Sequence, residues 1–166
     1  MQLYETATSH AAHPLDVVEQ LASLKQWSFD RADDDELSIS VTGGWADYHI
    51  AFTWLPELEA LHLGCAFDLK VADRRKSELL ALIALVNEQL WVGHFGFWAG
   101  EGVIIYRHSL LLTDGTRPSR SQCEAALKAA VDACERYFQS FQFVIWAGRS
   151  AREALESALF ETTGEA

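Results

Sequence analysis

The hydrophobic pattern between Gln26 and Asp68 has a period of two, which is typical of half-buried strands and excludes amphipathic helices there. Four stretches alternate in this way, centred on Trp27–Phe29, Leu37–Val41, Tyr48–Trp54 and Leu61–Phe67. Short turns separate the stretches, so we expect an antiparallel meander with one apolar face. A doubly wound parallel sheet requires helices between successive strands, and the absence of helical patterns here argues against it.

The segments around the meander have a helical period, apart from one further hairpin. We expect a helix from Pro14 to Gln26, a second near Arg74–Trp91 capped by Asp73, and a hairpin that turns at residues 99–102. A Ser121–Glu124 capping box predicts the start of a long helix ending near Ala147, and a short helix follows Ser150. The predicted class is α+β, an antiparallel sheet of a four-strand meander plus a two-strand hairpin packed against helices, in the order α-β-β-β-β-α-β-β-α-α.

The 166 residues fit one domain, residues 1–166, in which about 1–12 and 162–166 are expected to be flexible. The long helix carries a stripe that we expect to face the sheet: Leu127, Val131, Cys134, Phe138, Phe141 and Ile145. The second helix is apolar on all sides between Leu79 and Val86, so it needs cover from another helix or another subunit. The hairpin is also apolar on both faces, and we therefore expect a homodimer.

Charge and cysteine content restrict the partners and the compartment. With 13 Lys and Arg against 24 Asp and Glu, the net charge is −11, which disfavours nucleic acid and anionic membrane surfaces as partners. The start lacks a secretory signal, and the longest apolar run, Leu79 to Val86, is far shorter than the roughly 20 residues of a membrane span. The three cysteines have no close pairing pattern, so we expect a cytoplasmic protein with free thiols.

No catalytic, cofactor-binding or metal motif is found. The six histidines lack the spacing of zinc ligands, and the acidic run Asp33–Glu36 lacks the glycine of a calcium loop, so it is interpreted as a solvated turn. An enzyme with a noncontiguous site, in which His49, His94 or His108 lies beside a carboxylate in a cleft, remains the alternative. Asn87, the single asparagine, is expected to bond a neighbouring backbone group.

A candidate interface is found on the second face of the predicted sheet. Small residues on its outer face allow close approach of another element, although a plain solvated face is the competing interpretation. The hairpin adds apolar groups on one side, and two tryptophans flank the junction with the preceding helix, although the protein core is the favoured place for each tryptophan. The candidate binding residues are Trp91, Trp98, Val103, Ile105, Ala51, Gly64 and Ala66.

The run LLALIALVNEQLWVGHFGFWAGEGVIIYRHSLLL resembles the core of the YbjN family of bacterial sensory transduction regulators. The flanking segments WSFDRADDDELSISVTGGWADYHIAFTWLPELEALHLGCAFDLKV and CERYFQSFQFVIWAGRSAREAL extend the resemblance, which runs from about residue 14 to the C-terminus. It implies the fold of type III secretion chaperones, which commonly dimerise, and it brings no catalytic motif. The resulting hypothesis is a non-enzymatic protein-binding module, a chaperone- or adaptor-like regulator with a protein partner and no cofactor.

Overall fold

A computed structural model describes residues 13–67 and 69–163, in which six strands form one antiparallel sheet of order β1-β2-β3-β4-β6-β5. The strands are β1 (Ser28–Asp33), β2 (Glu36–Thr42), β3 (Asp47–Leu55), β4 (Ala60–Phe67), β5 (His94–Trp98) and β6 (Val103–Leu111). The helices are α1 (Pro14–Leu24), α2 (Lys76–Asn87), α3 (Arg120–Ile145) and α4 (Ala151–Thr163). The predicted class and element order are confirmed. The segments expected to be flexible lie outside the described residues, except for the end of α4.

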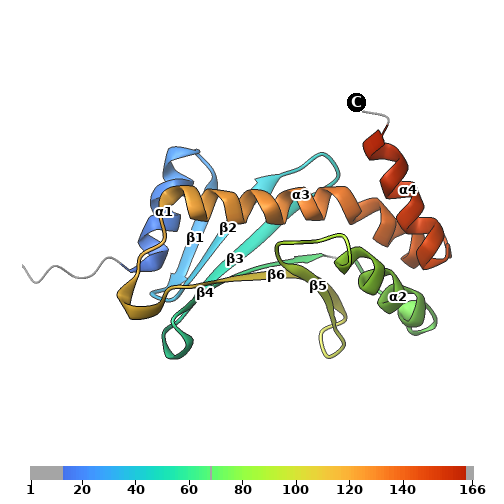
Figure 1. The fold of residues 1–166 in the computed structure, drawn as a ribbon, viewed down its shortest axis with the longest axis horizontal. Helices are drawn as coiled ribbons and strands as arrows, with labels where there is room; N and C mark the ends of the chain where they lie inside the picture. The colour runs from blue at the N-terminus through green and yellow to red at the C-terminus, as the bar shows by residue number, and fades with distance from the viewer. Residues whose placement is uncertain (1–12, 68, 164–166) are drawn as a thin grey trace, which may run out of the picture.

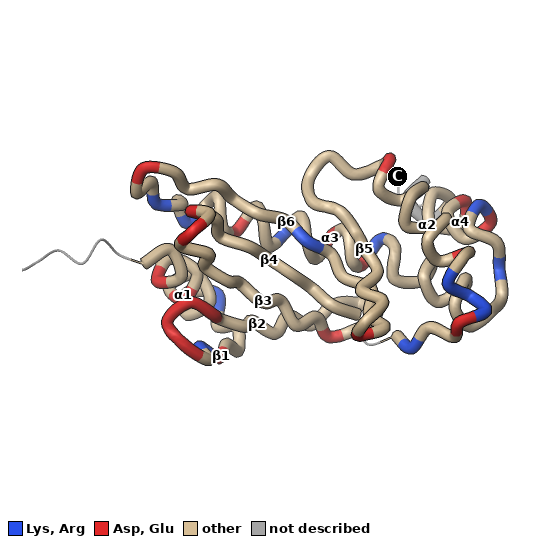
Figure 2. The backbone as a smooth tube through the Cα atoms, turned by 90° about the horizontal axis from the view of Figure 1, so that it is seen from below, with Lys and Arg blue, Asp and Glu red and all other residues tan. Residues whose placement is uncertain are grey.

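All four described helices lie on one side of the sheet or at its end (Figure 1). The long helix α3 crosses the strands, α1 lies beside it over the end of the sheet that contains β1, and α2 packs with α4 at the opposite end. Of the described elements, none covers the other side of the sheet, which faces the viewer in Figure 2. We call this side the open face.

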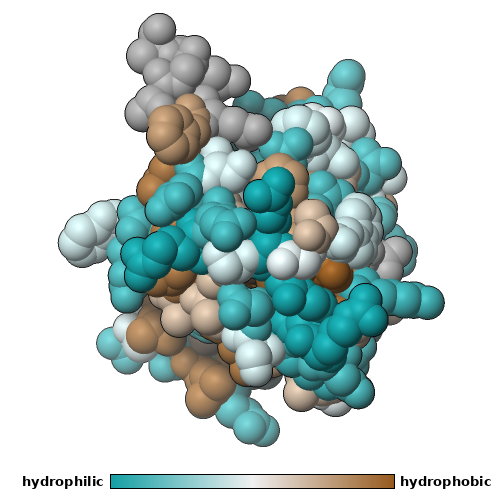
Figure 3. Space-filling model, turned by 90° about the vertical axis from the view of Figure 1, so that its right-hand side faces the viewer, coloured by the Kyte–Doolittle hydropathy of each residue, from teal (hydrophilic) through white to brown (hydrophobic). Residues whose placement is uncertain are grey.

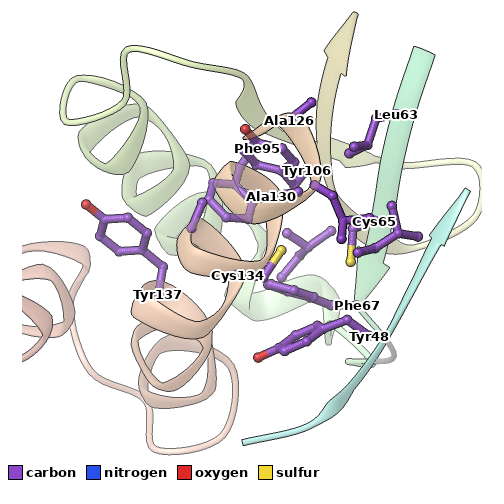
Figure 4. Close-up of a cluster of buried hydrophobic side chains, with 14 of the residues drawn as sticks. Tyr48, Leu63, Cys65, Phe67, Phe95, Tyr106, Ala126, Ala130, Cys134 and Tyr137 are labelled. Atoms are coloured by element: carbon purple, nitrogen blue, oxygen red, sulfur yellow. The ribbon is translucent and has the colours of Figure 1, made fainter. Parts of the chain in front are cut away.

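The core lies between the sheet and α3. Phe67 of β4 and Phe95 of β5 point at this helix, and their ring centroids lie 5.6 and 5.2 Å from that of the fully buried Phe141. Cys134 and Tyr137 belong to the same helix, and Figure 4 shows the thiol within the cluster while the Tyr137 ring points away from the sheet. One continuous apolar cluster therefore joins both ends of the sheet.

The start of α3 differs from the prediction by two residues. The capping box consists of Ser119 and Gln122, whose side chains each bond the other's backbone N–H, at 3.0 and 2.8 Å. Ser121 and Glu124 have the same spacing, but the helix begins two residues earlier, so both lie within it. The predicted stripe is also rotated slightly, because Val131 and Phe138 are only partly buried, whereas Ala130, Tyr137 and Val144 are buried.

The second helix is shorter than predicted. It spans Lys76–Asn87, and Asp73 begins a preceding 3-10 turn instead of capping the helix. Leu80 is 52% exposed, so the described chain leaves part of this helix uncovered, and its cover by another subunit stays a prediction. Its end is held by Asn87, whose amide donates to the Phe95 carbonyl at 2.9 Å and accepts from the Phe95 N–H at 2.8 Å. The prediction of a structural role for Asn87 is confirmed.

The N-terminal side of α1 is held by His13. The Nδ1 of His13 accepts a hydrogen bond from the Leu15 N–H at 3.1 Å. Its Nε2 lies 2.8 Å from a carboxylate oxygen of Asp35 in the β1–β2 turn. Pro14 occupies the first turn of the helix, as predicted. This histidine therefore caps the helix and ties it to the sheet.

A candidate binding surface on the open face of the sheet

The strand register brings all the predicted interface residues except Trp91 onto the open face. Ala51 pairs with Gly64 between β3 and β4, Ala66 pairs with Ile105 between β4 and β6, and Trp98 pairs with Val103 between β5 and β6. These positions alternate with core residues such as Cys65 and Tyr106, which point at α3. The small residues and the apolar hairpin residues thus form one continuous surface.

Trp91 lies elsewhere, in the loop between α2 and β5. It is 100% exposed, so the expectation that each tryptophan belongs to the core is wrong for this residue. It lines a groove of about 270 Å³ together with Ala129, Ala133 and Tyr137 of α3. The nearby end of the molecule, formed by α2 and α4, is mostly hydrophilic with separate apolar groups (Figure 3).

The centre of the open face is built around Ile105. Only 6% of this residue is exposed although no described helix covers it. Its neighbours explain this burial, because the guanidinium of Arg107 lies 5.5 Å from the ring centroid of Trp98 and the two side chains shield the isoleucine. A Cβ at Gly64 would lie 3.4 Å from Cδ1 of Ile105, so the glycine lets this side chain pack down on β4.

Arg107 and His62 are functional candidates that the sequence analysis missed. The Nε of Arg107 donates to Nε2 of His62 at 3.1 Å, which leaves Nδ1 of the neutral histidine to carry the proton. Burial lowers the pKa of His62, and the charge of Arg107 lowers it further. The alternation of side chains along the strands could have identified them, because His62 shares its face of β4 with Ala66 and Arg107 shares its face of β6 with Ile105.

The charge of the open face differs from that of the whole chain. The strands β4, β6 and β5, at one end of the sheet, contain no Asp or Glu, and they contain one formally charged residue, Arg107. Acidic residues gather at the opposite end, around α1 and the β1–β2 turn (Figure 2). A chain with a net charge of −11 therefore presents a neutral to positive region over these three strands.

The described residues give little support to the alternative hypothesis of a histidine–carboxylate catalytic site. There, His13 with Asp35 is the only histidine–carboxylate ion pair, and both ring nitrogens of His13 are already hydrogen-bonded. A hollow of about 640 Å³ beside α1 is lined by Asp16 and Glu19, but no histidine lines it. Both of these carboxylates pair with Arg31, at 2.8 and 3.0 Å.

The described part of the chain also contains no cluster of metal ligands and no exposed cysteine thiol. There, no group of three or more His, Cys, Asp or Glu residues is placed to hold a metal ion. The three cysteines are free and buried, and burial raises the pKa of Cys123 to about 11. The pKa of Cys134 is raised by its contact with Cys65 and by burial. Thiols of this kind are poor nucleophiles because the thiolate is the reactive form. None of the described helices is long and apolar enough to cross a membrane.

Comparison with known proteins identifies relatives of this architecture. Residues 14–143 match the sequence model of the YbjN family, described as "Putative bacterial sensory transduction regulator". The crystal structure of YbjN from E. coli is similar with a TM-score of 0.54 at 10% identity, over 73% of this chain and 85% of that chain. A chain of the HopA1–SchA chaperone–effector complex gives a TM-score of 0.52 at 11% identity, over 74% of this chain and 90% of that chain. A search of curated proteins finds no match. The expected chaperone-like fold is thereby confirmed.

Proposed function

The chain belongs to the YbjN family, and from this premise we propose that it is a non-enzymatic, chaperone- or adaptor-like regulator that binds a protein partner on the open face. The observation that carries the proposal is the open face itself, a six-stranded sheet surface without a helical cover among the described elements. We further propose that the chain acts as a single domain and as a homodimer.

The composition of the open face supports protein binding. Ala66 is exposed and Gly96 has open space where a side chain would stand, so a partner backbone can approach closely. Trp98, 38% exposed, offers a large ring beside these positions, and such rings are common anchors at interfaces. Similarity to a chain of a chaperone–effector complex supports the same kind of function.

Substitution Ala66→Arg is expected to remove the partner without unfolding the protein. Ala66 is exposed on β4, so an arginine is accommodated in solvent but covers the centre of the open face. Tagged wild-type protein and the variant are incubated with lysate of the source organism, and bound proteins are identified by mass spectrometry. Ala125→Arg, at an exposed position of α3 on the helical side of the sheet, is the control that keeps the partner. An identical set of bound proteins for wild type and Ala66→Arg contradicts the proposed binding face.

Self-association is supported by apolar side chains outside the open face. Leu80 of α2 is 52% exposed, and Trp91 and Val92 in the following loop are 100% and 44% exposed. Large exposed aromatic and aliphatic groups near one helix are typical of surfaces that another chain covers. In a twofold dimer the same surface of each subunit packs against its copy, so one interface covers both surfaces.

Light scattering at micromolar concentration and physiological salt is expected to give about twice the chain mass of 18.6 kDa. Trp91→Ala is expected to shift this mass toward the monomer, because it removes the most exposed ring of the proposed contact. Trp45→Ala removes another exposed tryptophan, in the β2–β3 turn, and is expected to leave the dimer intact. A monomeric wild-type protein over this concentration range contradicts the homodimer.

A further inference from the structure

We propose that the open face contains a carboxylate-binding site centred on Arg107, and that its occupant is an Asp or Glu side chain in an extended segment of the partner protein. This inference rests on the proposed function and adds the chemistry by which the partner is recognised. The site consists of Arg107 and Ile105 on β6, Trp98 and Gly96 on β5, and His62 on β4.

Arg107 is held in place before any partner arrives. Its Nε donates to His62 at 3.1 Å, and its guanidinium lies over the Trp98 ring at 5.5 Å from the centroid. The side chain is half-buried, so less of its conformational freedom remains to be lost on binding. A guanidinium fixed in this way offers its remaining N–H groups as a planar fork, which matches the two oxygens of a carboxylate.

The remaining donors of Arg107 are unused within the described chain. There, no carboxylate forms an ion pair with Arg107, whereas Arg31, Lys25 and Lys76 each have an acidic partner. The hydrogen bond from Nε to His62 occupies one of its five N–H groups. Among the described residues, the guanidinium of Arg107 is therefore free to bind an acceptor from outside the chain.

Space for the incoming group is found beside Arg107. Gly96 lies on β5 next to His94, the register partner of Arg107, and a Cβ at Gly96 would meet no atom within 4 Å. Its backbone carries no positive φ, so the glycine is not required by the strand conformation. The missing side chain therefore leaves open space on the strand surface between His94 and Trp98.

Charge and polarity favour a protein carboxylate as the occupant. Acidic residues at the margins of the sheet and a net charge of −11 repel a phosphate polymer, but a single acidic side chain needs only the central guanidinium. Trp98 and Ile105 flank that guanidinium and suit apolar residues on either side of the acid. The segment expected to bind is thus extended, with one acidic residue next to apolar ones.

A displayed library of random dodecapeptides tests this site. Peptides are selected on the full-length wild-type protein and then compared on three variants: Arg107→Gln, Gly96→Val and Ser38→Val. Gly96→Val fills this open space with a side chain that suits a strand, and Ser38→Val makes a matched change on the same face three strands from β6. Thermal unfolding of each variant confirms that the fold is retained.

We expect the selected peptides to share an Asp or Glu next to apolar residues and to lose binding on Gly96→Val but not on Ser38→Val. Calorimetry with the tightest peptide and its amide counterpart, Glu→Gln or Asp→Asn, is expected to show about tenfold weaker binding of the amide form to wild type. On Arg107→Gln both forms are expected to bind equally.

Three results would overturn the carboxylate site. Peptides that bind the open face without an acidic residue, or that tolerate the amide change, contradict the site but leave protein binding on this face intact. Retained acid preference on Arg107→Gln places the recognition on another residue. A library that yields no peptide sensitive to Gly96→Val contradicts this site, and peptides that are also insensitive to Ala66→Arg contradict the proposed binding face.

Discussion

Replacement of Phe141 by alanine is expected to lower the free energy of unfolding by about 3–5 kcal/mol. The side chain is completely buried in α3, and its ring lies 5.2 Å from that of Phe95 and 5.6 Å from that of Phe67. Alanine removes these contacts and leaves a cavity where α3 packs on β4 and β5. Chemical denaturation monitored by circular dichroism measures the change.

Phe138→Ala is the matched control for Phe141→Ala. Phe138 lies three residues earlier on the same helix and also contacts Phe67, at 5.6 Å between ring centroids, but it is only partly buried. Water already reaches part of this ring, so we expect a smaller loss of about 1–2 kcal/mol. Equal losses for both variants would contradict the phase that the structure gives to α3.

Substitution Gly93→Ala is expected to destabilise the protein by about 3–5 kcal/mol, because it combines backbone strain with a collision. Gly93 has a φ of +71°, and a Cβ there would collide with the hydroxyl and ring of Tyr106 and lie 2.9 Å from the Arg107 carbonyl. Tyr106 is completely buried and donates a hydrogen bond to the Val92 carbonyl at 2.8 Å, so its ring has little room to move. The midpoint of thermal unfolding is expected to fall accordingly.

Gly96→Ala provides the comparison for Gly93→Ala three residues later in the chain. This position combines open space with an ordinary strand conformation, so alanine is expected to change the stability by less than about 1 kcal/mol. If both alanine variants unfold at the same midpoint, the close approach of Gly93 to Tyr106 is not a constraint on the fold.

The secondary structure was predictable because period and turn chemistry are local properties. The alternation from Leu37 to Val41 and from Leu61 to Phe67 defines strands whose apolar faces point at the helical layer, β2 at α1 and β4 at α3. The start of α3 was ambiguous, because Ser119 and Ser121 each have a suitable partner three residues later. The two alternatives differ in their capping hydrogen bonds, which the structure forms at Ser119 and Gln122.

The sequence predicts which face of the sheet carries the candidate site, but it does not predict the contact at the middle of that site. Ala51, Gly64 and Ala66 share the open face because the side-chain period of a strand is two. The Arg107–Trp98 contact joins two strands and depends on the register of the hairpin, which the turn sequence alone left undefined.

The exposure of Trp91 has a different physical cause from the geometry of the open face. Asn87 bonds Phe95 across the intervening loop, and within this clamped loop Leu90 packs on the core whereas Trp91 and Val92 are exposed. Hydrophobicity alone would place the Trp91 ring in the core, but the path of the loop leaves the ring exposed to solvent. Such a clamp between an amide side chain and a backbone eight positions away is not visible in a hydrophobic pattern.

Because the chain emerges from the ribosome N-terminus first, the late position of α3 in the sequence affects folding during synthesis. Strands β1 to β4 are complete by residue 67, and their pairing is local, so a meander can form early. The helix that covers most of its apolar face begins only at Arg120, and β6 must first join β4. During that interval the nascent sheet presents Ile50, Phe52 and Leu63 to solvent, which makes this stage the most vulnerable to aggregation and to capture by cellular chaperones.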